Sequence, residues 1–207
     1  MSLVANEAEQ TTTTLALTSS ALMLALLWFL GLGGCSTGQD LKPIPAPEHV
    51  DLSKFMGDWY VIANIPTVIE KHAYQAVERY HLDENGSIAT SFSFRNGGFD
   101  SPVKTYHPRG FVVDTTTNAV WSMQFLWPFK ADYRIAHVDG EYQETVIART
   151  ARDYVWIMAR TPTLSAADYC RLLIFVHGLG YDMSALRQVP QVDGSAPITC
   201  PSAAALP

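Results

Sequence analysis

Eight short segments between Trp59 and Arg160 constrain the fold of this 207-residue chain more than any other feature. Each is rich in β-branched and aromatic residues, and several alternate apolar with polar side chains, as half-buried strands do. Turn signals such as Asn85-Gly86 and Asp139-Gly140 separate them. The segments are 59–65, 74–82, 88–94, 110–113, 119–126, 133–138, 145–148 and 154–160. Short strands at this spacing predict an all-β sandwich or barrel.

One helix is expected after the last strand. Ser165-Ala166-Ala167-Asp168 forms a capping box with Asp in place of Glu, and it precedes the apolar run 169–176. Gly178 and Gly180 then end the helix. The chain length suits one domain, which we place at residues 50–191.

The first 41 residues contain neither Lys nor Arg, and 15–32 are strongly apolar. The apolar run ends in Leu32-Gly33-Gly34-Cys35, and small residues after such a run predict a signal peptide over 1–34. Glu7 and Glu9 stand where a signal peptide carries positive charge, so an uncleaved anchor of marginal length is the alternative. Either segment places the folded part outside the cytoplasm.

Leu-Gly-Gly-Cys resembles the lipobox of bacterial lipoproteins. The resemblance implies that Cys35 carries diacylglycerol and becomes the acylated N-terminus after cleavage. Acyl chains contribute about 0.8 kcal/mol per buried CH₂, so several chains anchor firmly. Ser36 after the cysteine implies an outer-membrane location, with the domain facing the periplasm. Residues 35–49, with Pro43, Pro45 and Pro47, would then be an extended tether.

The C-terminal segment 192–207 is rich in Pro, Ala and Ser and predicts a disordered tail. Cys200 lies in it, and Cys170 lies on the expected helix. The two could form a disulfide in an oxidising periplasm. Alternatively, Cys170 is a small buried apolar residue.

Three motifs in order carry a family resemblance: Gly57-Asp58-Trp59-Tyr60, then Ala131-Asp132-Tyr133, then the run from Arg152 to Pro162. With them the chain resembles a lipocalin, of the bacterial outer-membrane lipoprotein type that is related to apolipoprotein D. This implies an eight-stranded antiparallel up-and-down barrel with a C-terminal α-helix packed on it. It also implies that the chain binds, and carries or stores, a fatty acid or a lysophospholipid.

In such a barrel the first and eighth strands are neighbours and antiparallel, so Trp59 and Arg160 lie at the same end. A guanidinium on the indole face would be a cation–π contact. Gly57 would let the chain turn closely beneath the barrel. We therefore expect Gly57, Trp59 and Arg160 to form the closed end, and the ligand to enter at the other.

Alternation along each strand predicts the side chains that point inward. On the first strand these are Val61, Ala63 and Ile65. The candidate ligand-binding residues are Glu78, Tyr80, Phe92, Phe94, Trp121, Met123, Phe125, Ile135, Tyr154 and Trp156. Their apolar and aromatic character suits a lipid tail. A packed barrel core with no cavity would have the same composition.

Glu78 is the exception in this set, because burying an unpaired carboxylate is costly. An ion pair with Arg95 or Lys104 is the favoured interpretation, and an ammonium head group of a ligand is the alternative. The apolar connection 126–129 lies at the expected open end. Its Trp127 and Phe129 could enter a membrane, cap the ligand or form a local cluster.

Other function classes have little support. A net charge of −6 without any Lys/Arg cluster argues against a nucleic-acid partner. The histidines lack H-E-x-x-H spacing and no G-x-S-x-G elbow occurs, so we expect no metal, no cofactor and no catalytic residue. Two alternatives stay open: a barrel enzyme acting on a lipid or isoprenoid through Glu78 or His137, and a structural envelope lipoprotein. Whether the chain forms a homodimer is also open.

Overall fold

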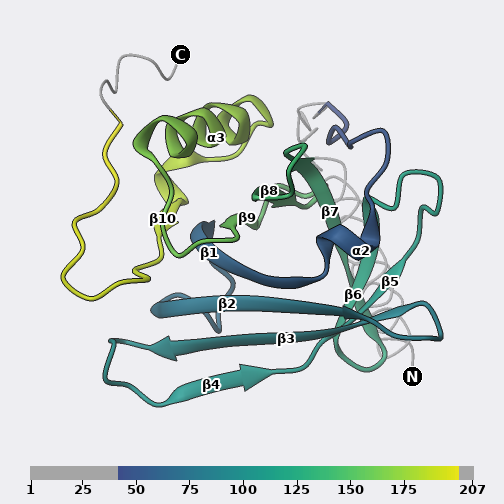
Figure 1. The fold of residues 1–207 in the computed structure, drawn as a ribbon, viewed down its shortest axis with the longest axis horizontal. Helices are drawn as coiled ribbons and strands as arrows, with labels where there is room; N and C mark the ends of the chain where they lie inside the picture. The colour runs from purple at the N-terminus through teal and green to yellow at the C-terminus, as the bar shows by residue number, and fades with distance from the viewer. Residues whose placement is uncertain (1–41, 201–207) are drawn as a thin grey trace, which may run out of the picture. The chain divides into compact units, whose positions relative to one another are not determined.

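The computed structural model describes residues 42–200. Within them ten strands form one antiparallel sheet, and β1 pairs with β9, so the sheet closes into a barrel (Figure 1). The strands are β1 (Gly57–Ile65), β2 (Ala73–Leu82), β3 (Ser87–Asn96), β4 (Val103–Tyr106), β5 (Arg109–Val112), β6 (Val120–Leu126), β7 (Phe129–Val138), β8 (Glu144–Ala148), β9 (Val155–Ala159) and β10 (Arg187–Gln188). The helices are α2 (Leu52–Phe55), α3 (Ala166–Gly178) and the 3₁₀ turn η1 (Met183–Ala185).

The eight expected strands are present, and two more elements complete the sheet. β4 and β5 both pair with β3. The break between them falls at His107-Pro108, since proline has no N–H to donate to a strand ladder. β10 pairs with the C-terminal half of β1, at Ala63 and Asn64, whereas β2 pairs with the N-terminal half, from Gly57 to Tyr60. The closed barrel of eight strands is therefore confirmed.

A bulge in β1 changes which of its side chains point inward. The register against β9 shifts between Val61 and Ala63, so the alternation is interrupted there. Val61 packs in the barrel interior, but Ala63 and Ile65 pack outside it, with the residues of α3. The prediction that Ala63 and Ile65 point inward is therefore wrong. Asn64 lies opposite Trp156 instead, on the interior face.

The end of the barrel nearest α2 is filled with side chains. Asp51 caps α2 by accepting hydrogen bonds from the backbone N–H groups of Ser53 and Lys54. Phe55, at the end of this helix, is fully buried, and its ring lies 5.1 Å from that of Trp59. The indole Nε1–H of Trp59 donates to the Phe55 carbonyl at 2.8 Å. This end of the barrel is closed.

Helix α3 covers the outer face of β1, β7, β8 and β9 (Figure 1). Its buried residues Tyr169, Leu172 and Val176 pack on small and β-branched side chains of those strands. No helix within the described part of the chain has the length and apolarity that crossing a bilayer requires.

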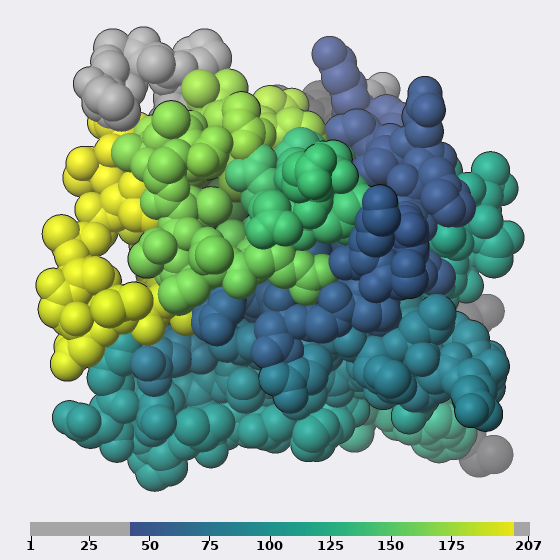
Figure 2. Space-filling view, in the orientation of Figure 1, coloured from purple at the N-terminus to yellow at the C-terminus, as the bar shows by residue number. Residues whose placement is uncertain are grey.

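The segment after β10 is tied to the helix by a disulfide between Cys170 and Cys200, whose Cα atoms are 5.6 Å apart. Gln188 adds two hydrogen bonds to the backbone of Ile198. Figure 2 shows this segment, in yellow, beside the green helix. These contacts join Ile198 and Cys200 of the C-terminal segment to β10 and α3.

Candidate ligand-binding cavity

A cavity of about 330 Å³ lies inside the barrel between the β1–β2 loop and the β6–β7 hairpin. Its outer rim is apolar and exposed, with Val68 76%, Ile69 42% and Phe125 55% accessible. Its inner end is formed by the buried side chains of Met123 and Tyr133 and by Glu78. The barrel therefore contains a cavity. The alternative of a packed core without a cavity, which the composition alone allowed, does not hold.

A larger depression of about 700 Å³ lies at the opposite end, beside the β2–β3 turn. Asp83, Glu84 and Arg109 line it, and Arg109 pairs with Asp83 there. It is lined by the turn itself and by β5, and two of its three charged side chains are paired with each other. The smaller cavity inside the barrel is the better candidate for an apolar ligand.

Glu78 is the most unusual group in the cavity, because only 6% of it is exposed and no ion pair reaches it from residues 42–200. The expected partner Arg95 donates to Gln75 and to the Ser101 carbonyl instead. The other, Lys104, is exposed on β4. The prediction of an ion pair is wrong. Burial, with a smaller contribution from the Glu70 charge, raises the pKa of Glu78 to about 8.

A second buried carboxylate, Glu70, lies in the β1–β2 loop behind the cavity wall. Its Oε1 accepts from the Thr67 N–H at 2.9 Å, and its Oε2 accepts from the Trp156 indole Nε1–H at 3.2 Å. Burial raises the pKa of Glu70, while these hydrogen bonds act in the opposite direction. Asn64 lies beside Glu70, and both polar atoms of its fully buried amide lack a hydrogen-bond partner of good geometry.

The two remaining charged side chains of the wall are already paired. Asp132 accepts from Arg134 at 3.0 Å and from the Thr150 N–H at 2.8 Å. Arg149 lies 3.3 Å from Asp153 and over the ring of Tyr154. Among residues 42–200, no cluster of His, Cys, Asp and Glu is arranged to hold a metal ion. The cavity is thus an apolar pocket with an acidic, unpaired inner end.

The arrangement of barrel, cavity and covering helix can be compared with known proteins. A family model described as a lipocalin-like domain matches residues 50–191, the same bounds that the sequence predicts for the domain. The chain belongs to the lipocalin family.

Several lipocalins are similar to it in sequence. The outer membrane lipoprotein Blc of Citrobacter freundii is 27% identical over 157 residues, which cover 76% of this chain and 88% of that protein. Apolipoprotein D of Macaca fascicularis is 32% identical over 152 residues, covering 67% of this chain and 78% of that protein. Both relatives agree with the subgroup that the motifs indicate.

Solved structures support the fold. Lobster apocrustacyanin A1 superposes with a TM-score of 0.55 at 10% identity, over 72% of this chain and 91% of that one. The cockroach allergen Per a 4 gives 0.54 at 18% identity, over 72% and 94%. At such identities the likeness concerns the lipocalin barrel alone.

The ten candidate ligand-binding residues separate into two groups in this lipocalin. Those that line the cavity are Glu78, Met123, Phe125, Tyr154 and Trp156. Those buried elsewhere in the barrel core are Tyr80, Phe92, Phe94, Trp121 and Ile135. Phe55 accounts for part of the second group, since its ring lies 5.6 Å from that of Tyr80 and 5.5 Å from that of Trp121. The rings of Phe55, Tyr80 and Trp121 thus pack together beside Trp59 at the closed end.

Some residues of the cavity wall were not predicted from the sequence. Thr67, Val68 and Ile69 belong to the loop after Pro66, where strand alternation does not apply. Two adjacent apolar residues in a loop at the open end were the available signal. Tyr133 also lines the cavity, and its hydroxyl is hydrogen-bonded to that of Tyr80. It lies two residues before the candidate Ile135 on β7, so strand alternation was the available signal.

Proposed function

We propose that the chain is a membrane-anchored lipocalin that binds fatty acids or lysophospholipids and carries or stores them in the bacterial envelope. The observation that carries the proposal is the cavity of about 330 Å³ inside a closed barrel. Eight-stranded barrels have room for one small ligand, and this volume is at the lower end of the range for ligand pockets. Such a space favours a single chain over a two-chain lipid.

The walls suggest how an acyl chain would bind. It would pass between the exposed rim residues Val68, Ile69 and Phe125 and end against the flexible side chain of Met123. Each methylene removed from water contributes about 0.8 kcal/mol. An anionic head group would stay at the rim, where Arg149 lies in the wall.

The membrane anchor is a separate part of the proposal. Cys35 and the signal peptide 1–34 lie outside the described residues, and the lipobox-like sequence supports their roles. The similarity to outer membrane lipoproteins supports the location. Labelled palmitate should enter the wild-type chain and Cys200→Ala but not Cys35→Ala. Incorporation into Cys35→Ala would contradict the anchor.

The β6–β7 hairpin would bring the cavity mouth to the membrane. Leu126, Trp127 and Phe129 on this hairpin are 71%, 81% and 73% exposed. Contact of these apolar side chains with water is unfavourable, and insertion into the membrane interface would remove it. Lys130 follows directly on the same hairpin. Ligand would then pass between bilayer and cavity over a short distance.

Binding can be tested by titrating the full chain, stripped of lipid, with a cis-unsaturated fatty acid and with a lysophospholipid. Both should quench intrinsic fluorescence and raise the melting temperature. Trp156 lines the cavity and Trp121 does not, so Trp156→Phe should remove most of the quenching and Trp121→Phe should keep it. Unchanged fluorescence and melting temperature with both lipids would contradict the proposal.

A further inference from the structure

The inner end of the cavity holds carboxyl groups that no cationic side chain of the described residues neutralises when they ionise. Glu78 lines it directly, and Glu70, 2% exposed, lies behind Trp156. Within residues 42–200 neither carboxylate has a Lys, Arg or His within ion-pair distance. Buried carboxylates are ordinarily paired or hydrogen-bonded, because bare burial is costly.

The arginines on neighbouring elements are engaged elsewhere. Arg149 pairs with Asp153. Arg187 on β10 donates to the backbone carbonyls of Glu70 and Ala73, at 3.2 and 2.8 Å, and not to the Glu70 carboxylate. Within residues 42–200 no side chain is therefore placed to act as the counter-ion when Glu78 ionises, and a cation inside the cavity could take that place.

Two tyrosines next to Glu78 supply no charge. Tyr80 and Tyr133 are hydrogen-bonded to each other through their hydroxyl groups, and burial raises the pKa of both well above the ordinary value. Both hydroxyls therefore stay protonated. Glu78 is therefore the group at the inner end of the cavity that can become charged near neutral pH.

We propose that the inner end of this cavity binds the protonated amine of a single-chain amphiphile, with Glu78 as the counter-ion. An ammonium offers three donors, and charge-assisted hydrogen bonds to carboxylates are the strong ones. A ligand carboxylate in the same place would face the like charge of Glu78 whenever that group is ionised. The inference rests on the proposed function, because it requires that the cavity accept a single-chain ligand.

The titration of Glu78 gives the binding a characteristic pH dependence. In the empty protein the carboxyl, with its pKa near 8, holds a proton below that pH, and an entering ammonium must displace it. The groups facing Glu78 are Glu70, which acts in the same direction, and the neutral hydroxyls of Tyr80 and Tyr133. Alkylamines keep their charge up to a pH of about 10. Amine affinity should thus rise on the order of tenfold per pH unit between pH 6 and 8.

The test compares dodecylamine, dodecanol and dodecanoate, each below its micelle concentration, by calorimetry on the full chain stripped of lipid. At pH 8 dodecylamine should bind at least tenfold more tightly than dodecanoate, and the difference should narrow at pH 6. Glu78→Gln should remove both the preference and the pH dependence. Glu84→Gln, the same change at an exposed turn position outside the barrel, should keep both.

The outcomes separate this inference from the proposed function. Dodecanoate binding as tightly as dodecylamine at pH 8, or a preference unchanged in Glu78→Gln, would overturn the amine site and leave a lipid-binding lipocalin. Absence of binding of all three amphiphiles would overturn both. The head-group and pH comparisons on the wild-type chain decide the matter even where Glu78→Gln fails to fold.

Discussion

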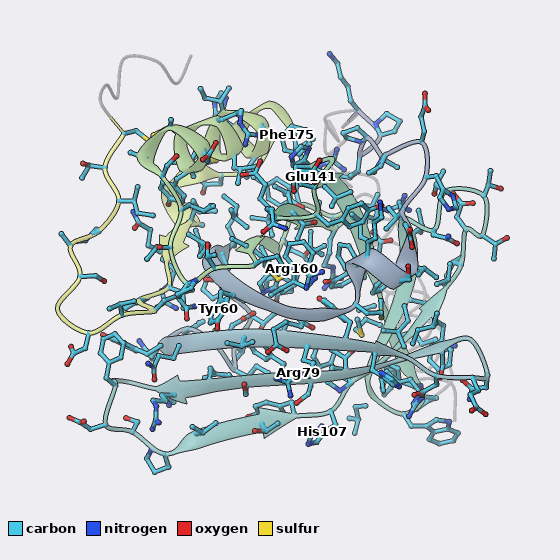
Figure 3. The ribbon with its side chains drawn as sticks, in the orientation of Figure 1. Tyr60, Arg79, His107, Glu141, Arg160 and Phe175 are labelled. Carbon is cyan, nitrogen blue, oxygen red and sulfur yellow. A yellow bond between two sulfur atoms is a disulfide. The ribbon has the colours of Figure 1, made fainter. Side chains whose placement is uncertain are left out.

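The guanidinium carbon of Arg160 lies 3.8 Å from the centre of the Trp59 ring, at the end of the barrel closed by α2. Figure 3 shows Arg160 beside this helix. Its N–H groups also donate to the backbone carbonyls of Asp58 at 2.8 Å, Met56 at 2.9 Å and Tyr142 at 3.2 Å. One side chain on the loop after β9 thereby joins α2, the start of β1 and the β7–β8 turn.

Arg160→Ala should destabilise the fold by about 3 kcal/mol, because a cation–π contact and several charge-assisted hydrogen bonds are lost together. Arg160→Lys should destabilise the fold by about half as much as Arg160→Ala, since an ammonium cannot reach the same set of carbonyls as a planar guanidinium. Urea unfolding followed by Trp fluorescence measures both changes.

Arg79→Ala is the matched control. Arg79 is hydrogen-bonded to Asp58 near the same end, but its side chain is 66% exposed, and exposed ion pairs contribute little. If Arg79→Ala lowered the unfolding free energy as much as Arg160→Ala, the role of Arg160 in closing the barrel would be contradicted.

The buried carboxyl of Glu78 should make the protein less stable as pH rises. Its pKa is about 8 in the folded chain and near 4.5 when unfolded, so the folded state binds the extra proton between these values. The contribution of the Glu78 carboxyl to the free energy of unfolding is therefore fully present below about pH 4.5 and is lost as pH rises through about 8. The difference corresponds to roughly 4–5 kcal/mol at about 1.36 kcal/mol per pH unit. The raised pKa of Glu70 acts in the same direction.

Glu78→Gln cannot ionise and should therefore lack this loss. The unfolding free energies of the wild-type chain and the variant should be similar at pH 5 and differ by several kcal/mol in favour of the variant at pH 9. Taking the difference between the two proteins cancels the titration of all shared groups. A difference independent of pH would show that Glu78 is ionised, or solvated, in the folded protein.

The sequence predicted the barrel well because its signals are local. Strand alternation, the Asn85-Gly86 turn and the capping box at Ser165 each act over a few residues, and all have their expected structure. The bulge between Val61 and Ala63 has no such signal, since it follows from pairing with β9, nearly a hundred residues away. Because of this bulge, the Ala63 side chain points out of the barrel and the Asn64 side chain points into it.

The cavity was harder to predict for a related reason. Alternation shows that Tyr80 and Trp121 belong inside the barrel, and they do. It cannot show that Phe55, from a helix outside the strands, fills the space beside them. Nor can it decide whether a nearby arginine reaches Glu78, because that depends on hydrogen bonds such as the one between Arg95 and Gln75.

The disulfide should stabilise the fold measurably. Cys170 and Cys200 are 30 residues apart, and closing a loop of that length restricts the unfolded chain by about 3–4 kcal/mol. Cys170→Ser with Cys200→Ser should therefore lower the unfolding free energy by up to that amount. A reducing agent should produce the same loss in the wild-type chain and none in the double variant. Equal unfolding curves for the two oxidised proteins would contradict this.

Phe125 at the rim of the cavity should contribute to the affinity for an acyl chain. The Phe125 side chain lines it and is half exposed, so a bound acyl chain would bury the remaining part of the ring. Half the burial of a phenylalanine is worth about 1 kcal/mol, which corresponds to about fivefold in affinity. Phe125→Ala should weaken fatty-acid binding by that factor.

Phe129 allows a matched comparison, because it lies on the same hairpin, opposite Leu126, but does not line the cavity. Titration of both variants with one fatty acid in aqueous buffer should give weakened binding for Phe125→Ala and wild-type binding for Phe129→Ala. With lipid vesicles as the source of ligand, Phe129→Ala should instead slow transfer, since its exposed ring would contact the bilayer. Equal loss of affinity in buffer would mean that the hairpin acts as a lid over the whole mouth.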